Sequence, residues 1–219
     1  MGVIAGAALV GAAAGTSGAL LTGGPESTSD DTALFHGASR LPSTTPQDWV
    51  TYADYVLVLR PTAEQPTSLS GDDDALVMRD VASDVVRVAW RSPSATQSAP
   101  SQLNMVMVGT HTTSDGEQID VAMEGAPRLE VGHTYLAAVS YVPARCSAGD
   151  IPEPAHFELL GEDALVPFDK GVVGQGEMEG TVRTASAASA AQGEQALVSV
   201  LRGTSPARRQ TFSAPAPCS

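Results

Sequence analysis

The chain has 219 residues, of which 42% are hydrophobic and only 5% aromatic, and its formal net charge at pH 7 is −13. This length allows one domain of ordinary size with terminal extensions, and its core is expected to consist mostly of Val, Leu and Ala. Because an acidic protein repels phosphate groups, the charge argues against binding to nucleic acid or to anionic lipid surfaces. The same charge excess favours solubility.

Residues 1–24 are predicted to be a signal peptide or a membrane anchor. They contain an uncharged apolar run at residues 3–21, which is typical of the hydrophobic region of such segments, although no positively charged side chain precedes it. The alternative is a buried, alanine-rich core helix. We therefore expect an extracytoplasmic protein, membrane-anchored or secreted, that contacts the membrane through this segment alone.

Residues 25–48 are dense in Gly, Ser, Thr, Pro and Asp, which predicts a disordered linker. A β-domain is expected over residues 49–180. Its first strand is predicted at residues 52–60, followed by a polar turn at residues 61–66.

Residues 76–90 alternate only in part between apolar and polar side chains, which indicates either a strand pair or one long bent strand. Residues 103–108 and 119–123 are predicted to form a hairpin, because the Asp115-Gly116 dipeptide between them favours a tight turn. Two short strands are expected at residues 156–160 and 164–168, on either side of the turn at 161–163.

The strongest fold signal lies at residues 129–143, where we predict a short strand, a glycine turn and a long strand. Gly132 stands where the turn needs a positive φ. Residues 134–142 are rich in β-branched, aromatic and small apolar side chains, and both faces of the strand are apolar. This segment is therefore predicted to be a central strand of the sheet.

Residues 181–219 are predicted to form a C-terminal helix and a mobile tail. Good helix formers fill residues 185–201, and several apolar residues there share one side of a helix. Short strands separated by turn residues, followed by one helix, define a mainly β fold class. We expect an antiparallel β-barrel or sandwich, similar to an OB fold, with one C-terminal helix.

Two of these segments, YADYVLVLR at 52–60 and LEVGHTYL at 129–136, resemble motifs of exported or membrane-anchored actinobacterial proteins of unknown function. The domain of those proteins resembles a small OB-like or netrin-like β-barrel, which a long strand opens and a short helix often ends. The resemblance spans residues 49–201 and implies fold and location. It brings no catalytic residue, and the paired N-terminal cysteines of the metalloprotease inhibitors with that fold are missing.

The chain contains two cysteines, Cys146 and Cys218. In an exported protein, an even count suggests a disulfide that ties the C-terminal end to the loop after the central strand. In a reducing compartment they would be two independent thiols. Both possibilities remain open at this stage.

Chemical motifs are scarce. The four histidines are scattered without metal-ligand spacing, and Asp72, Asp73 and Asp74 lack the alternation of a calcium loop, so we expect neither a metal nor another cofactor. The motifs of serine hydrolases, P-loops and dinucleotide-binding folds do not occur. These observations predict a protein that is not an enzyme.

We accordingly expect an extracytoplasmic binding domain that recognises an unknown protein or envelope ligand. The candidate interaction surface consists of Trp90, His133, Tyr135 and Tyr141. One alternative is a secreted hydrolase with a site assembled from distant residues, for instance His111 or His133 with Asp115 or Asp120. The other is a structural protein of the cell envelope.

Overall fold

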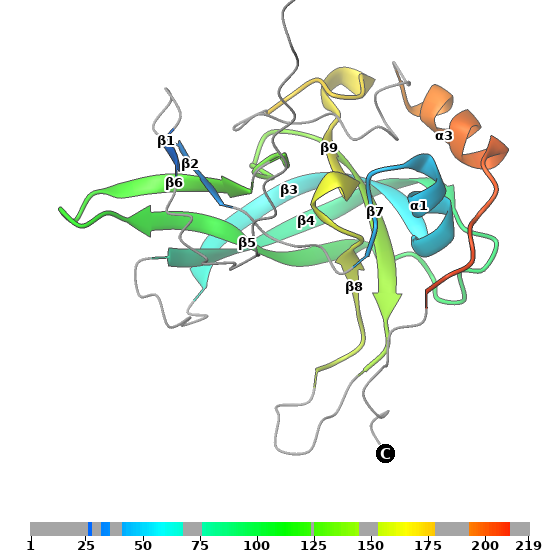
Figure 1. Ribbon diagram of the computed structural model, residues 1–219, viewed down its shortest axis with the longest axis horizontal. Helices are drawn as coiled ribbons and strands as arrows, with labels where there is room; N and C mark the ends of the chain where they lie inside the picture. The colour runs from blue at the N-terminus through cyan, green and yellow to red at the C-terminus, as the bar shows by residue number, and fades with distance from the viewer. Residues whose placement is uncertain are drawn as a thin grey trace, which may run out of the picture.

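The computed structural model describes residues 26–27, 32–35, 41–67, 76–123, 125–144, 153–177 and 193–210. Within these residues the protein is mainly β: nine strands form one curled sheet with the shape of a half-barrel (Figure 1), and the C-terminal helix follows the strands. This confirms the predicted fold class. The elements are β1 (Glu26–Ser27), β2 (Thr32–Phe35), α1 (Pro46–Tyr52), β3 (Tyr55–Thr67), β4 (Leu76–Arg91), β5 (Gln102–Thr112), β6 (Gln118–Met123), β7 (Tyr135–Val142), β8 (His156–Leu159), β9 (Leu165–Pro167) and α3 (Glu194–Gly203).

The strands follow the order β1-β2-β6-β5-β4-β3-β7-β8, and β9 also pairs with β7. Neighbouring strands are antiparallel except for the short β2 and β6 pair. Strands β1 and β2 and the first turn of α1 fall within residues 25–48, so this part of the chain is not wholly the linker that its composition predicted. The β5–β6 hairpin and the short strands β8 and β9 confirm the sequence predictions.

Helix α1 ends at Tyr52, the first residue of the segment that was predicted to be the first strand. Thr45 caps this helix: its hydroxyl accepts a hydrogen bond from Asp48 N at 3.1 Å, and its own N–H donates to Asp48 Oδ2 at 2.9 Å. Pro46 follows at the first helical position, where a missing N–H costs nothing. The strand therefore begins at Tyr55, three residues later than predicted.

The turn predicted at residues 61–66 is wrong, because β3 continues through both prolines to Thr67. Pairing with β7 ends at Leu59, so within the described residues the second half of β3 has β4 as its only neighbour. Proline is tolerated in such an edge segment, since its missing N–H removes no bond to a second strand. Strand β4 is a single long strand with register shifts, the second of the two predicted possibilities.

Strand β7 is the central strand that the sequence predicted. All of its residues are buried except Tyr141, and it pairs with β3 along one edge and with β8 and β9 along the other. Gly132 has φ +99°, which confirms the turn before the strand. Residues 129–131, however, form a loop rather than a short strand, and Leu129 itself has φ +65°.

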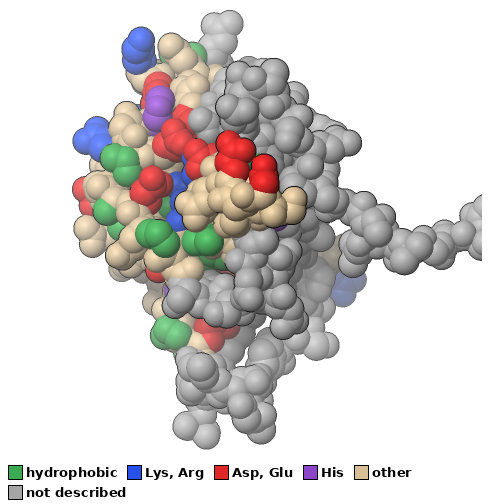
Figure 2. Space-filling model, turned by 90° about the vertical axis from the view of Figure 1, so that its left-hand side faces the viewer, with side chains coloured by type: hydrophobic (Ala, Val, Ile, Leu, Met, Phe, Trp, Pro, Cys, Tyr) green, Lys and Arg blue, Asp and Glu red, His purple; other side chains and the backbone are tan. Residues whose placement is uncertain are grey.

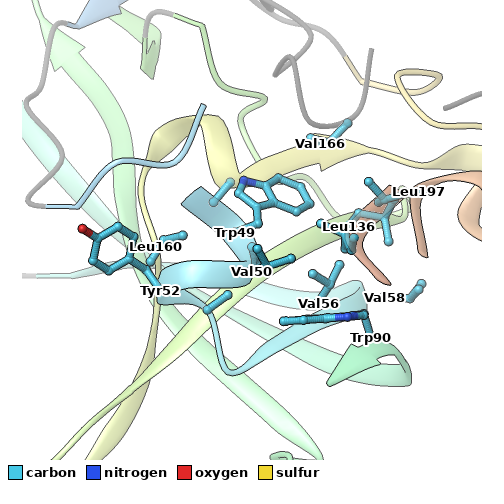
Figure 3. Close-up of a cluster of buried hydrophobic side chains, with 14 of the residues drawn as sticks. Trp49, Val50, Tyr52, Val56, Val58, Trp90, Leu136, Leu160, Val166 and Leu197 are labelled. Carbon is cyan, nitrogen blue, oxygen red and sulfur yellow. The ribbon is translucent and has the colours of Figure 1, made fainter. Parts of the chain in front are cut away.

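Two apolar clusters cover the two faces of β3 and β7. On one face, Val56, Val58 and Leu136 pack against α1 and α3 through Trp49, Leu197 and Leu201 (Figure 3). On the other face, Leu57, Leu59 and Ala137 pack inside the curl of the sheet against side chains of β4 and β5. Helix α3 therefore packs on the β-domain as predicted, and both helices lie at one end of the molecule in Figure 1.

No helix in the described part of the chain is long and apolar enough to cross a bilayer. The apolar run at residues 3–21 lies outside the described residues. So do Cys146, Cys218 and the aspartates at 72–74, and their predicted roles therefore remain predictions.

Candidate binding site: an arginine-lined cleft

A cleft of about 810 Å³ lies between helix α1, the end of β4 and the C-terminal part of the chain. Val50 and Thr51 of α1, Trp90 of β4 and Leu201 of α3 contribute buried side chains, and Ser92 is buried as well. The remaining lining residues come from the end of β4 and the loop after it (Val88, Ala89, Arg91, Ser92, Pro93 and Ser94) and from the end of α3 and the segment beyond (Arg202, Thr204, Pro206, Ala207 and Arg209).

One wall of the cleft is an extended segment, residues 204–210, that belongs to the tail predicted to be mobile. Hydrogen bonds hold this segment against α1. Thr51 Oγ1 accepts from Ala207 N at 2.8 Å, and Thr51 O accepts from Arg209 Nε at 2.6 Å. The Tyr52 hydroxyl accepts from Gln210 N at 3.3 Å. Helix α1 therefore holds residues 204–210 in place, and this segment belongs to the folded part of the chain.

Three arginines, Arg91, Arg202 and Arg209, line this cleft, and all three are exposed. The Arg91 guanidinium donates to Ala95 O at 3.0 Å and lies over the ring of Tyr55, so it is directed toward the cluster on the face of the sheet opposite Trp90. No Asp or Glu occurs among the described lining residues, and no described carboxylate lies within ion-pair distance of the three guanidinium groups. Arg202 and Arg209 therefore bring positive charge to the cleft, and no described carboxylate pairs with either of them.

Three of the other five described arginines pair with carboxylates. Arg79 pairs with Glu64, Arg87 with Glu194, and Arg128 with Asp120 and Glu130, whereas the exposed Arg60 and Arg208 have no carboxylate partner in the described part of the chain. The hydrogen bond to Glu194 raises the pKa of Arg87. Of the five described arginines without an ion pair, three line one cleft, although the guanidinium of Arg91 is directed away from it.

Acidic side chains gather at the end of the molecule away from the arginine-lined cleft. Figure 2 views the end that carries the β5–β6 hairpin and shows acidic side chains gathered near its centre. The arginine-lined cleft lies by α1 and α3, at the opposite end in Figure 1. An anion is therefore attracted to the cleft and repelled by the acidic end of the molecule.

The structure does not bring the four predicted surface residues together. Trp90 and Tyr135 are 8% and 0% exposed and belong to clusters on opposite faces of the sheet, so they do not form one exposed patch. The Tyr135 hydroxyl donates to Glu177 Oε2 at 3.0 Å and accepts from Glu130 N at 2.8 Å, and burial raises the pKa of Tyr135. Tyr141 packs edge to face on Phe157.

The pairs proposed for a hydrolase are not formed either. His133 Nδ1 lies 2.6 Å from Asp169 Oδ2, a carboxylate that the sequence reasoning did not consider. His111 pairs in register with Ile119, one residue before Asp120, so the side chains of His111 and Asp120 point to opposite faces of the hairpin. Asp120 instead pairs with Arg128 at 2.7 Å.

Asp115, the other carboxylate proposed for the hydrolase, accepts a hydrogen bond from the Thr113 hydroxyl at the tip of the hairpin, which lowers the pKa of Asp115. Within the described residues, no three His, Cys, Asp or Glu side chains lie close enough to share a metal ion.

A second hollow of about 300 Å³ lies between β5 and β6 on one side and β8 and β9 on the other. Methionines and aliphatic side chains line it, including Met78, Met107 and Met123, and its charged lining residues are the carboxylates Glu158 and Glu162. It offers apolar volume but no basic or neutral hydrogen-bonding side chain among its described lining residues. We therefore regard the arginine-lined cleft as the better candidate site.

The arginine-lined cleft was missed in the sequence because its residues are far apart: more than 100 positions separate Arg91 from Arg202 and Arg209. The available signal was the charge of the C-terminal region, where residues 181–219 hold four arginines and one acidic residue in an otherwise acidic chain.

The fold and the cleft together define a β half-barrel domain with a basic ligand-sized site. Comparison of the chain with family models, with curated proteins and with solved structures found no match.

Proposed function

We propose that this protein is an extracytoplasmic binding domain and that its ligand places a negatively charged group in the arginine-lined cleft. The observation that carries the proposal is that Arg202 and Arg209 line one cleft without a carboxylate among its described lining residues. Guanidinium groups bind oxyanions through paired hydrogen bonds as well as through charge. A ligand anion supplies the counter-charge that the described side chains do not provide.

The charge of the whole molecule limits the size of this ligand. With a net charge of −13, the protein repels a long polyanion along most of its surface, which disfavours nucleic acid. A ligand with its charge confined to one end avoids this repulsion. The cleft volume of about 810 Å³ lies within the range of about 300–1,000 Å³ that is common for small-molecule sites.

The proposed location rests on the uncharged run at residues 3–21 and on the resemblance to exported actinobacterial proteins. Export also favours a Cys146–Cys218 disulfide. Intact mass measured with and without reductant, on protein from membrane and culture fractions, tests both points. A chain shortened at its N-terminus and lighter by two hydrogens supports them, and a full-length, reduced cytosolic chain contradicts them.

Thermal unfolding in citrate tests the proposed anion binding. At constant ionic strength, citrate is expected to raise the melting temperature of the wild-type protein, because a ligand that binds only the folded state stabilises it. The Arg202→Gln variant should lose most of this increase. Arg60→Gln is the matched control, since it also removes one exposed positive charge, from β3 and outside the cleft.

Citrate also stabilises proteins non-specifically by exclusion from their surfaces, so the informative quantity is the difference between the two variants. An equal increase in melting temperature for wild type, Arg202→Gln and Arg60→Gln contradicts the proposal.

A further inference from the structure

The two tryptophans of the chain differ in how their indole N–H groups are satisfied. Trp49, which is fully buried, donates to Ser43 O at 2.6 Å. Trp90 is 8% exposed, and no described residue accepts a hydrogen bond from its Nε1. Among the described residues, the fully buried polar atoms without a partner do not include this nitrogen, so it reaches solvent, and Trp90 lines the arginine-lined cleft. A ligand that binds there can replace the water at this N–H with an acceptor of its own.

The same part of the cleft exposes apolar surface. Val88, beside Trp90 on β4, keeps 41% of its surface exposed, and Val50 and Leu201 add buried aliphatic side chains to the lining. A bare inorganic anion would contact the arginines but would leave this apolar surface in water. A ligand with an apolar body gains free energy by covering it.

We infer that the ligand is a small organic oxyanion with an apolar body, such as an aryl or alkyl carboxylate. Its body packs on Val88 and Trp90, and its oxygens accept hydrogen bonds from Trp90 Nε1 and from the cleft arginines. This inference rests on the proposed function and adds the class of ligand to it. It also assigns to Trp90 a role in specificity, because the indole N–H selects for an acceptor near the apolar body.

The test uses the indole N–H signals of the ¹⁵N-labelled full chain. Two tryptophans give two such signals, and Trp90→Phe identifies the one that belongs to Trp90. The probes are naphthalene-2-carboxylate, the neutral naphthalene-2-methanol and inorganic phosphate, all at equal ionic strength. Naphthalene-2-carboxylate is expected to shift the Trp90 signal in a saturable manner and to leave the Trp49 signal in place, because Trp49 N–H is already bound to Ser43.

Naphthalene-2-methanol is expected to bind about tenfold more weakly than the carboxylate, and Arg202→Gln should weaken carboxylate binding about tenfold, since losing one charge-assisted hydrogen bond has an effect of this order. Phosphate should produce no saturable shift of the Trp90 signal.

Each contrary result has a separate meaning. If phosphate binds as tightly as the carboxylate in an Arg202-dependent manner, the inferred ligand class is wrong while the anion site stands. If naphthalene-2-carboxylate binds without moving the Trp90 signal, the role of Trp90 is refuted. If the alcohol binds as tightly as the carboxylate, or if no probe binds in the cleft, both the inference and the proposed function are overturned.

Discussion

Thr51 is the residue that joins α1 to the wall of the cleft, and replacing its hydroxyl tests how the wall is held. The side chain is 2% exposed; its Oγ1 accepts from Ala207 N at 2.8 Å and donates to Gln47 O at 2.5 Å. Thr51→Val keeps the size and β-branching but removes both bonds. The Arg209 bond to the backbone oxygen of Thr51 does not require the hydroxyl and should remain.

The expected cost follows from these contacts. An intramolecular hydrogen bond contributes about 1 kcal/mol net, and Gln47 O has an alternative donor in the helix, so only the Ala207 bond is lost outright. Since Ala207 is exposed, its N–H regains a water partner and no large desolvation penalty is added. We therefore predict a loss of about 1 kcal/mol in the free energy of unfolding, or about 2–4 °C in the melting temperature for a chain of this size.

Amide hydrogen exchange measures the local effect. In the wild type, the Ala207 amide should be protected, and in Thr51→Val it should exchange markedly faster while the amides of β7 stay unchanged. Thr51→Ser is the control, because it keeps the hydroxyl and with it the bond to Ala207 N. An unprotected Ala207 amide in the wild type, or equal exchange in the Val and Ser variants, would refute this account of the wall.

Three further predictions concern the body of the fold. Leu197→Ala should lower the free energy of unfolding by about 2–5 kcal/mol in chemical denaturation, because Leu197 is fully buried between α3 and the sheet, whereas the exposed Gln195→Ala should change it by less than about 0.5 kcal/mol. Arg79→Met should lower the free energy of unfolding by about 3 kcal/mol or more, since the buried guanidinium donates to the backbone oxygens of Val108, Arg128 and Leu129. Arg60→Gln, a change at an exposed arginine, serves as the comparison. Burial raises the pKa of Tyr135 above its ordinary value of 10.0, so the unfolded chain loses the phenol proton at lower pH than the folded chain. The free energy of unfolding should therefore fall as the pH rises above about 10, and Tyr135→Phe should reduce that fall. Ultraviolet absorbance of the phenolate during alkaline unfolding measures the effect.

The strands could be predicted where the local sequence indicates the same structure that the tertiary packing favours. Strand β7 is apolar on both faces because α1 and α3 cover one face and the curled sheet covers the other, and its sequence shows this directly. The β5–β6 hairpin was predictable because Asp115-Gly116 fits only a few backbone conformations, and Gly116 indeed has φ +87°.

The sequence predictions were wrong where neighbouring residues indicate different structures. The capping box of Thr45 and Asp48 with Pro46 between them marks the start of a helix, but the adjacent strand-like residues outweighed it. Taken alone, Pro61 and Pro66 predict a turn. In the structure they lie in the part of β3 beyond Leu59, where pairing with β7 has ended and a missing N–H removes no bond to a second strand.

The candidate site was less predictable than the fold. Trp90 was predicted to belong to an exposed interaction surface with Tyr135 and Tyr141, whereas in the structure it is buried and lines the cleft. The arginines of the cleft were not selected, because nothing local distinguishes them from solvated charges. Their significance depends on the docking of residues 204–210 against α1, which is a long-range contact through Thr51 and Tyr52.

The most direct test of the central claim, that the cleft binds anions through its arginines, is the affinity of naphthalene-2-carboxylate measured by isothermal titration calorimetry at low and at high salt. Wild type and Arg60→Gln should bind with the same affinity, which should fall as salt rises, and Arg202→Gln combined with Arg209→Gln should bind about 100-fold more weakly. Equal affinities for wild type and the double variant, or no dependence on salt, would contradict the claim.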